Sequence, residues 1–168
     1  DPRGELAMDD LTKLESEENA TLRLQPCTSP VWDTAIVMNA LAEAHLDPNH
    51  SAMRRATDWI LSKEVNIRGD WQFKRPNLQP GGWYFEFAND FYPDIDDTAM
   101  VLMALKKTGY APGKGAACRR ALDWLLGMQG SDGGWASFDV DNNKRIFNYI
   151  PFADHNAMLD PTCPDISG

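Results

Sequence analysis

The chain has 168 residues, 43% hydrophobic and 24% charged, which is the composition of a globular protein large enough to bury a core. Its net charge of −9 argues against a nucleic-acid partner and against attraction of this segment to anionic lipid. The three cysteines form no CxxC pair, which favours free thiols over a zinc site or a disulfide framework. No apolar run reaches the roughly 18 residues that a membrane-spanning helix needs.

An internal repeat organises the chain. Residues 29–41 and 93–105 share Asp-Thr-Ala, a valine and Ala-Leu at a shift of 64 positions, and residues 55–61 and 120–126 match at a shift of 65. Each copy predicts a helix, a short link, a second helix and a Gly/Pro-rich loop with a Gly-Trp turn. We place the turn tryptophan at Trp71 in the first copy and at Trp135 in the second. A third copy opens at Asp165.

The repeat predicts an all-α fold of stacked helical hairpins. Apolar residues recur at helical spacing on the two helices of the first copy, as Ala35, Met38, Ala42 and Leu46 and then as Met53, Ala56, Trp59 and Ile60. Hairpins of this kind bury their faces only by stacking on further copies. Two and a fraction copies cannot close a ring, so we expect residues 1–168 to be a partial domain, incomplete at both ends. The long loops 65–92 and 130–164 are expected to carry function.

Three carboxyl groups, of Asp94, Asp96 and Asp97, stand directly before the apolar run 99–105. Crowding and burial raise the pKa of a carboxyl group, so at least one proton should remain near neutral pH. A helix N-terminus has the opposite effect on the pKa, and the sequence does not decide which effect is larger. A carboxyl group that keeps its proton in an apolar pocket can act as a general acid.

The repeat separates structural from functional carboxyl groups. Asp33-Thr34 and Asp97-Thr98 precede equivalent helices, so Asp97 is open to two interpretations, a structural N-cap and a functional group. The first copy has Pro30 and Trp32 where the second has Asp94 and Asp96. Since a cap needs one carboxylate, the extra ones predict a functional role, above all for Asp96.

An aromatic cluster precedes the acidic motif. It has two interpretations, core filling or a carbohydrate platform on one side and pocket walls that stabilise a cation on the other. Its closeness to a proton donor favours the walls, since a dry aromatic cavity suits carbocation chemistry. The cluster consists of Trp83, Tyr84, Phe85, Phe87, Phe91 and Tyr92. A calcium loop at 139–150 is set aside, because Lys144 and Ile150 replace its glycine and glutamate.

Several motifs of the chain match those of a known family. Residues 94–99 resemble a DxDD protonation motif and residues 129–135 a QW motif, with Glu64 standing where the earlier copy should have glutamine. Further matches are at 27–34, 74–82, 139–142, 150–155 and 160–161. With these motifs the chain resembles the squalene–hopene cyclases, a family of bacterial triterpene cyclases. It would cover about a quarter of such an enzyme, the central stretch of an (α/α) toroid.

The resemblance implies roles for individual residues. Asp96 resembles the donor of a proton to the terminal double bond of squalene, and Asp94 and Asp97 resemble the carboxyl groups that set its geometry. Positions similar to cavity walls and to the neck of the substrate channel are Trp32, Phe85, Tyr92, Phe138, Phe152, Ala153 and His155. Positions that support the acid are Ser29, Asp33 and Asp165. The implied product is hopene, by an isomerase reaction, or hopanol, by a hydro-lyase-type reaction, without metal or organic cofactor.

The resemblance also implies where such an enzyme works. The complete protein is expected at the cytoplasmic face of the bacterial membrane, attached peripherally through a part outside this chain. The sequence does not decide whether the complete protein forms a homodimer. This stretch alone is expected to be inactive. Alternatives are a class II diterpene cyclase, an oxidosqualene cyclase, an α/α-barrel glycoside hydrolase, or a non-catalytic helical-repeat binding module. The binding module predicts solvated carboxylates, and the glycoside hydrolase predicts two opposed carboxylates across a polar cleft.

Overall fold

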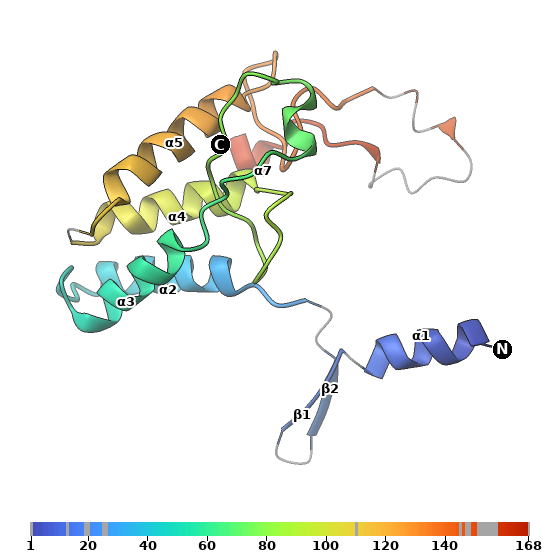
Figure 1. Cartoon of the computed structure of the whole chain (residues 1–168), viewed down its shortest axis with the longest axis horizontal. Helices are drawn as coiled ribbons and strands as arrows, with labels where there is room; N and C mark the ends of the chain where they lie inside the picture. The colour runs from blue at the N-terminus through green and yellow to red at the C-terminus, as the bar shows by residue number, and fades with distance from the viewer. Residues whose placement is uncertain are drawn as a thin grey trace.

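The computed structural model describes residues 2–12, 14–18, 21–24, 27–109, 111–144, 146, 149–150 and 158–167. Figure 1 shows the elements in chain order. They are α1 (Pro2–Thr12), β1 (Glu15–Glu18), β2 (Thr21–Leu24), α2 (Pro30–Glu43), α3 (Ser51–Leu61), the 3₁₀ helix η1 (Asp70–Phe73), α4 (Ile95–Lys107), α5 (Lys114–Gly127) and α7 (Pro164–Ser167).

The N-terminal part lies apart from the helical body (Figure 1). Strands β1 and β2 pair antiparallel, with Glu15 opposite Leu24 and Glu18 opposite Thr21. This hairpin was not predicted from the repeat, which begins later in the chain. Its sequence signal is the alternation of Leu22 and Leu24 with polar residues, since a strand points successive side chains to opposite faces. Both leucines are exposed.

The helical body consists of two paired hairpins, as the repeat predicts. Helix α2 packs on α3, α4 packs on α5, and the first helices of the two copies, α2 and α4, pack on each other. Figure 1 shows α2 and α4 running in the same direction, with α3 and α5 returning. This arrangement of stacked helical hairpins confirms the predicted all-α fold class, with the small β hairpin as an addition. It is the architecture of a fragment of an α/α toroid.

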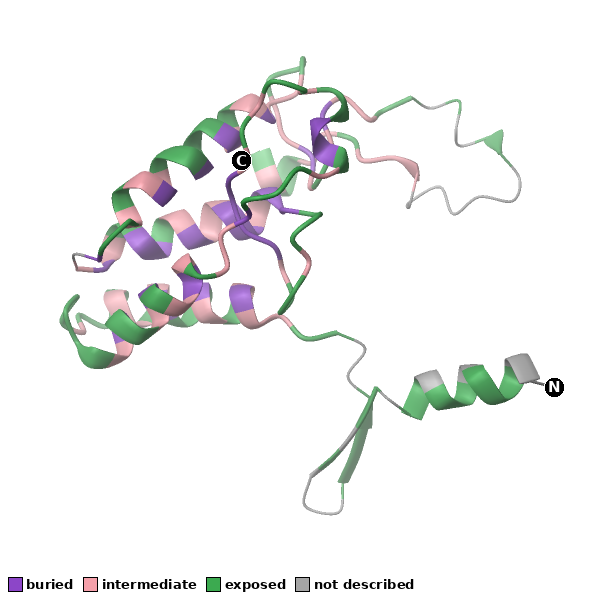
Figure 2. Ribbon diagram, in the orientation of Figure 1, coloured by how far each residue is buried: buried purple, intermediate pink, exposed green. Residues whose placement is uncertain are grey.

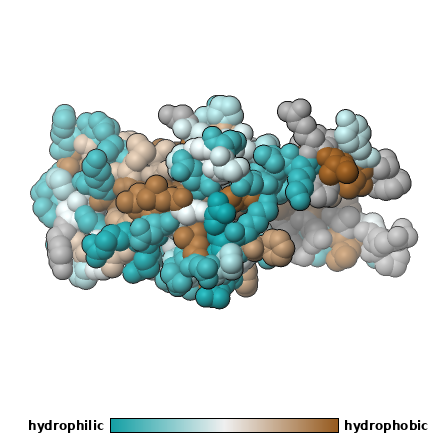
Figure 3. Space-filling view, turned by 90° about the horizontal axis from the view of Figure 1, so that it is seen from above, coloured by the Kyte–Doolittle hydropathy of each residue, from teal (hydrophilic) through white to brown (hydrophobic). Residues whose placement is uncertain are grey.

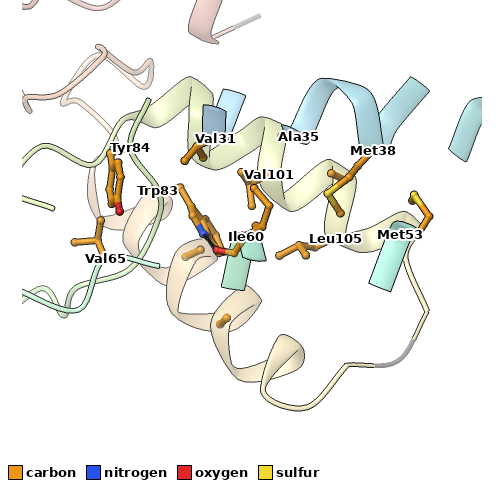
Figure 4. Close-up of a cluster of buried hydrophobic side chains, with 13 residues drawn as sticks. Val31, Ala35, Met38, Met53, Ile60, Val65, Trp83, Tyr84, Val101 and Leu105 are labelled. Carbon is orange, nitrogen blue, oxygen red and sulfur yellow. Dashed lines mark hydrogen bonds between the residues drawn. The ribbon is translucent and has the colours of Figure 1, made fainter. Parts of the chain in front are cut away.

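The main core lies between the hairpins. The predicted faces of the first copy point into it: Ala35, Met38, Met53 and Ile60 are buried, and their helical neighbours pack against them. Small residues, Ala104 on α4 and Ala117 and Ala121 on α5, complete the contact. Burial follows the inner faces of the helices in Figure 2. In Figure 4, Trp83 from the first long loop lies among Ile60, Val101 and Leu105, so the loop is part of this core.

Helix α2 ends earlier than its apolar pattern. The helix stops at Glu43, and His45 adopts a left-handed φ of 62° that turns the chain. Leu46 still packs against the core, because its N–H donates to the Leu41 carbonyl at 3.0 Å and folds the link back. The apolar periodicity therefore predicted the buried face correctly but extended the helix beyond its end.

The surface seen in Figure 3 is mostly hydrophilic, with separate apolar areas on the helical body. The exposed apolar side chains on the helices of the body include Ile36, Val37, Met103, Leu122 and Leu126. Within the described part of the chain, no helix is both long and apolar enough to cross a membrane.

Candidate active site

The acidic motif forms the N-terminus of α4. Oxygen atoms of Asp94, Asp96 and Asp97 lie within 4.8 Å of one another. Asp94 is the N-cap, and its carboxylate accepts the Asp96 N–H at 3.2 Å. Asp97 lies inside the first turn, and its N–H donates to the Asp96 carboxylate at 3.2 Å. The interpretation of Asp97 as the N-cap is therefore wrong, because the helix begins at Ile95 rather than after Asp97.

The three carboxyl groups differ in burial. Asp94 is 7% exposed and Asp97 1% exposed, whereas Asp96 is half-buried. Burial raises the pKa of Asp94 to about 9, and a side-chain hydrogen bond with Asp96 acts in the same direction. Burial, with the charge of Asp96, raises the pKa of Asp97 to about 7. Burial thus outweighs the helix dipole, and near neutral pH the cluster holds a proton, first of all on Asp94.

One oxygen of the cluster has no partner among the described residues. Asp97 Oδ1 is buried and accepts no hydrogen bond from that part of the chain. A buried carboxylate oxygen without a donor is costly, and protonation of the group reduces the cost. The carboxyl groups of Asp94 and Asp97 are therefore both held in surroundings that favour the neutral form.

Both long loops form hydrogen bonds with the start of α4. The Trp83 carbonyl accepts the Asp94 N–H at 2.7 Å, and the Thr98 hydroxyl oxygen accepts the Trp83 N–H at 2.9 Å. From the second loop, the Ser137 carbonyl accepts the Ile95 N–H at 3.0 Å. Gly82 allows the first loop to approach, since its φ is +92° and a Cβ there would lie 2.7 Å from Thr98 Oγ1. The loops therefore position the acidic motif.

The hydrogen bonds correct the alignment of the repeat. The indole N–H of Trp83 donates to the Ile60 carbonyl at 2.7 Å, as that of Trp135 does to Leu125 at 2.8 Å. The tryptophan equivalent to Trp135 is therefore Trp83, not Trp71. The prediction failed because the first loop carries a long insertion before its Gly-Trp turn. Trp71 instead packs edge-to-face on a helix tryptophan.

Glu64 stands where the repeat has glutamine, and it forms an ion pair with the second copy. At the matching position, Gln129 Nε2 donates to the Gly133 carbonyl at 2.6 Å within its own turn. The Glu64 carboxylate instead accepts from Arg120 Nε and Nη2, both at 2.7 Å. The first copy therefore keeps the turn but ties it to helix α5 of the second copy.

The start of a third copy is confirmed by α7. The Ser167 hydroxyl accepts the Trp135 N–H at 2.8 Å, just as Thr98 accepts that of Trp83. Asp165 stands two residues before Ser167, as Asp96 stands two residues before Thr98. The third copy thus presents an exposed carboxyl group at the position of the half-buried one in the second copy.

A pocket of about 610 Å³ lies beside the acidic motif. Two of the predicted wall residues, Tyr92 and Phe138, line it together with Phe91 and Trp71. Pro93 also lines it, but the three acids that follow Pro93 do not. The Tyr92 hydroxyl donates to Asp70 Oδ2 at 3.2 Å across the pocket wall. The pocket joins aromatic faces with carboxylates at the side of the α4 N-terminus.

The remaining predicted site residues divide into three groups. Trp32 and Phe85 are half-buried and do not line the pocket. Ser29 donates its hydroxyl hydrogen to Asp33 Oδ2 at 3.0 Å at the start of α2, and their support of the acid stays a prediction. The predicted channel neck lies outside the described residues, namely Phe152, Ala153 and His155.

The aromatic cluster divides between the core and the pocket wall, and stabilisation of a cation by the wall stays a prediction. Trp83 and Tyr84 are buried and belong to the core. Phe87, Phe91 and Tyr92 are exposed, and the last two line the pocket. The local pattern could not separate these members, because a continuous aromatic run has neither helical nor strand periodicity.

Sequence reasoning missed the residues that hold the loops. In the sequence, Thr98 stands out only as part of the repeated Asp-Thr-Ala, and Asp160 only as part of a family match. The Asp160 carboxylate accepts three backbone N–H groups from residues 137–139. The available signal was an aspartate before a proline at the end of a long loop, which indicates a loop-closing side chain but not its partners.

Comparison with known proteins identifies the family. Residues 28–168 match the family model of the squalene-hopene cyclase C-terminal domain. The chain is 45% identical to the squalene-hopene cyclase of Schizosaccharomyces japonicus over 99% of its length, and 46% identical to that of Bradyrhizobium diazoefficiens over 85%. The chain belongs to the squalene-hopene cyclase family.

The relatives are much longer than this chain. It spans 26% of the Schizosaccharomyces japonicus protein, 22% of the Bradyrhizobium diazoefficiens protein and 23% of the Alicyclobacillus acidocaldarius squalene-hopene cyclase, to which it is 41% identical. These shares confirm the expectation that the chain covers about a quarter of such an enzyme. The family occurs in fungi as well as in bacteria.

Proposed function

We propose that this chain forms the acid-bearing part of a squalene–hopene cyclase, which protonates squalene and directs its polycyclisation to hopene or hopanol. The observation that carries the proposal is the buried carboxylate cluster at the start of α4, where burial raises the pKa of Asp94 to about 9. A neutral carboxyl group at neutral pH is what protonation of an unactivated alkene requires.

The Asp94–Asp96 pair delivers the proton in this proposal. Asp94 holds it, and the hydrogen bond between the side chains carries it to Asp96, the less buried of the two. The π electrons of the terminal double bond form the new C–H bond, which leaves a tertiary carbocation and a carboxylate on the pair. Each ring closure consumes a further double bond and moves the cation. Loss of a proton from the final cation gives hopene, and addition of water followed by loss of a proton gives hopanol.

The aromatic side chains stabilise the moving cation. Tyr92 and Phe138 line the pocket beside the acid helix, and π faces attract cations while they exclude water. Trp32 and Phe85 complete the wall in the whole enzyme, as do Phe152, Ala153 and His155 at the entrance. Ser29, Asp33 and Asp165 support the acid from neighbouring helix starts. Squalene is apolar, so its affinity comes from burial.

The proposal extends to the cellular setting of the whole enzyme. Squalene dissolves in lipid rather than in water, which favours an enzyme bound peripherally to the membrane at its cytoplasmic face, through a part outside this chain. A homodimer of the whole enzyme is the assembly to test. The rival proposal, a non-catalytic binding module, expects solvated carboxylates, and the 7% and 1% exposed fractions of Asp94 and Asp97 oppose it.

The test uses a complete polypeptide. We define the grafted cyclase as the Bradyrhizobium diazoefficiens relative with its matching segment replaced by residues 28–168. It should convert squalene to cyclised product, and Asp96→Asn should lower kcat by about 100-fold or more, the usual contribution of a general acid. The control is Asp123→Asn, an exposed position on α5, which should retain activity. Undiminished product from Asp96→Asn would reject the acid assignment.

A further inference from the structure

Asp160 holds a backbone turn in the second long loop. Its Oδ1 accepts the Ser137 N–H at 3.2 Å, and its Oδ2 accepts the Phe138 and Asp139 N–H groups at 2.6 and 2.7 Å. The Asp160 N–H donates in turn to the Asn142 carbonyl at 2.9 Å. The two sides of the loop are thereby fastened at one carboxylate. Hydrogen bonds to an ionised acceptor are stronger than those between neutral groups.

The turn that Asp160 holds is the one that touches the acid helix. The Ser137 carbonyl accepts the Ile95 N–H at 3.0 Å, one of the first N–H groups of α4, which have no partner within the helix. Ile95 lies between Asp94 and Asp96 in the chain. The backbone position of Ser137 therefore affects where both acids lie.

The same turn places an aromatic wall. Phe138, whose N–H Asp160 binds, lines the 610 Å³ pocket, and so do Ser137, Asp139 and Asp160 itself. Asn142 reinforces the turn by donating from Nδ2 to Asp139 Oδ2 at 2.8 Å. One carboxylate thus fixes both the cap on the acid helix and an aromatic side chain of the pocket.

We propose that Asp160 is a positioning residue of the cyclase, which acts through the 137–139 backbone turn on the N-terminus of α4 and on Phe138. The proposal rests on the proposed function for its effect on rate, but its structural part is testable without catalysis. The carboxylate is specific for this task, because it offers acceptors only. An asparagine would direct an NH₂ group, which accepts nothing, at one of the N–H donors.

The experiment compares two tethers of one loop in the grafted cyclase. Asp160→Asn replaces one of the two acceptor oxygens that hold the 137–139 turn with an NH₂ group. Asp141→Asn is the matched control, since Asp141 Oδ1 accepts the Ser131 N–H at 2.8 Å and the Ser131 hydroxyl at 2.9 Å, whereas the 137–139 N–H groups donate to Asp160. Asparagine also tolerates the left-handed φ of 52° at position 141. Hydrogen exchange and steady-state kinetics on squalene are measured for both.

The expected signature separates positioning from general stability. Asp160→Asn should speed the exchange of the Ile95 and 137–139 amides and lower kcat by about tenfold or more, since small misplacements of reacting groups are costly. KM for squalene should change less than about threefold, because apolar burial is retained. Asp160→Glu, which keeps the acceptors, should recover part of kcat. Asp141→Asn should change neither the Ile95 exchange nor kcat.

Three results would overturn the inference: unchanged Ile95 exchange in Asp160→Asn, unchanged kcat in a folded variant, or equal losses in the two asparagine variants. A failure of the proposed function is distinguishable from these. In that case the unmodified grafted cyclase makes no cyclised product, whereas faster Ile95 exchange in Asp160→Asn alone still supports the structural part.

Discussion

The indole N–H of Trp83 donates to the carbonyl oxygen of Ile60 over 2.7 Å, which fastens the first long loop to the end of α3. The backbone of the same residue binds the start of α4. Its carbonyl accepts the Asp94 N–H, and its N–H donates to the Thr98 hydroxyl oxygen. Trp83 is fully buried in the core between the hairpins. One tryptophan therefore connects the end of α3 with the start of α4 and with the acid cluster.

This relationship predicts different costs for two tryptophans. Trp83→Phe removes one donor to the Ile60 carbonyl, which keeps the Lys63 N–H at 2.9 Å, and should lower the free energy of unfolding by about 0.5–1.5 kcal/mol more than Trp71→Phe. Trp71 is the matched control, since it is also buried, but its indole nitrogen has no partner among the described residues. Urea unfolding of the grafted cyclase measures both. Equal losses would mean that the indole hydrogen bond contributes nothing.

Thr98 should be sensitive to the loss of its hydroxyl group rather than to a change of shape. The side chain is fully buried, and Thr98→Val removes the acceptor for the Trp83 N–H while it keeps the volume. We expect a loss of about 1–3 kcal/mol in the free energy of unfolding. Thr98→Ser, which keeps the hydroxyl, should lose about 1 kcal/mol. If serine and valine are equally destabilising in urea unfolding, packing alone explains the position.

The raised pKa values predict a stability that falls as the pH rises. The pKa of Asp94 is raised from 3.8 to about 9, and that of Asp97 from 3.8 to about 7. The folded state therefore binds more protons than the unfolded state between these values. The resulting stabilisation is complete below the unfolded pKa and is lost as the pH passes about 7 for Asp97 and about 9 for Asp94.

The test of this pH dependence is a comparison of slopes. Asp94→Asn removes the group with the higher pKa, so the free energy of unfolding should fall less steeply between about pH 7 and pH 9 than in the unmodified grafted cyclase. Asp123→Asn, at an exposed site, should leave the slope unchanged. Turnover should decline over the same range, because the acid must be protonated. A slope unaffected by Asp94→Asn would contradict the buried neutral carboxyl group.

The Glu64–Arg120 pair should matter more than an exposed ion pair of equal length. The Glu64 side chain is 7% exposed, so Arg120→Ala leaves a carboxylate buried without its partner and should cost about 1–2 kcal/mol. The control is Lys107→Ala at the 2.7 Å pair with Glu43, whose side chain is 73% exposed. Such surface pairs contribute about 0–1 kcal/mol. Urea unfolding that gives equal losses for the two variants would show that burial of Glu64 is unimportant.

The sequence by itself determined the repeat, the helices and the acidic motif. The faces of α2 and α3 follow from the spacing of Ala35, Met38, Met53 and Ile60, which is a local property of the chain. The cluster of Asp94, Asp96 and Asp97 could be located for the same reason, since adjacent residues at a helix start lie close together in any fold. The family resemblance depends on the same short motifs.

Only the tertiary structure decided how these parts act together. Whether burial or the helix dipole sets the pKa of Asp94 depends on the loops that cover it, and those loops come from residues far apart in the chain. The choice of Trp83 over Trp71, and the three N–H groups bound by Asp160, likewise depend on hydrogen bonds across long loops. Loop closure over such distances leaves no periodic trace in a sequence, because each contact is fixed by the packing of the whole domain.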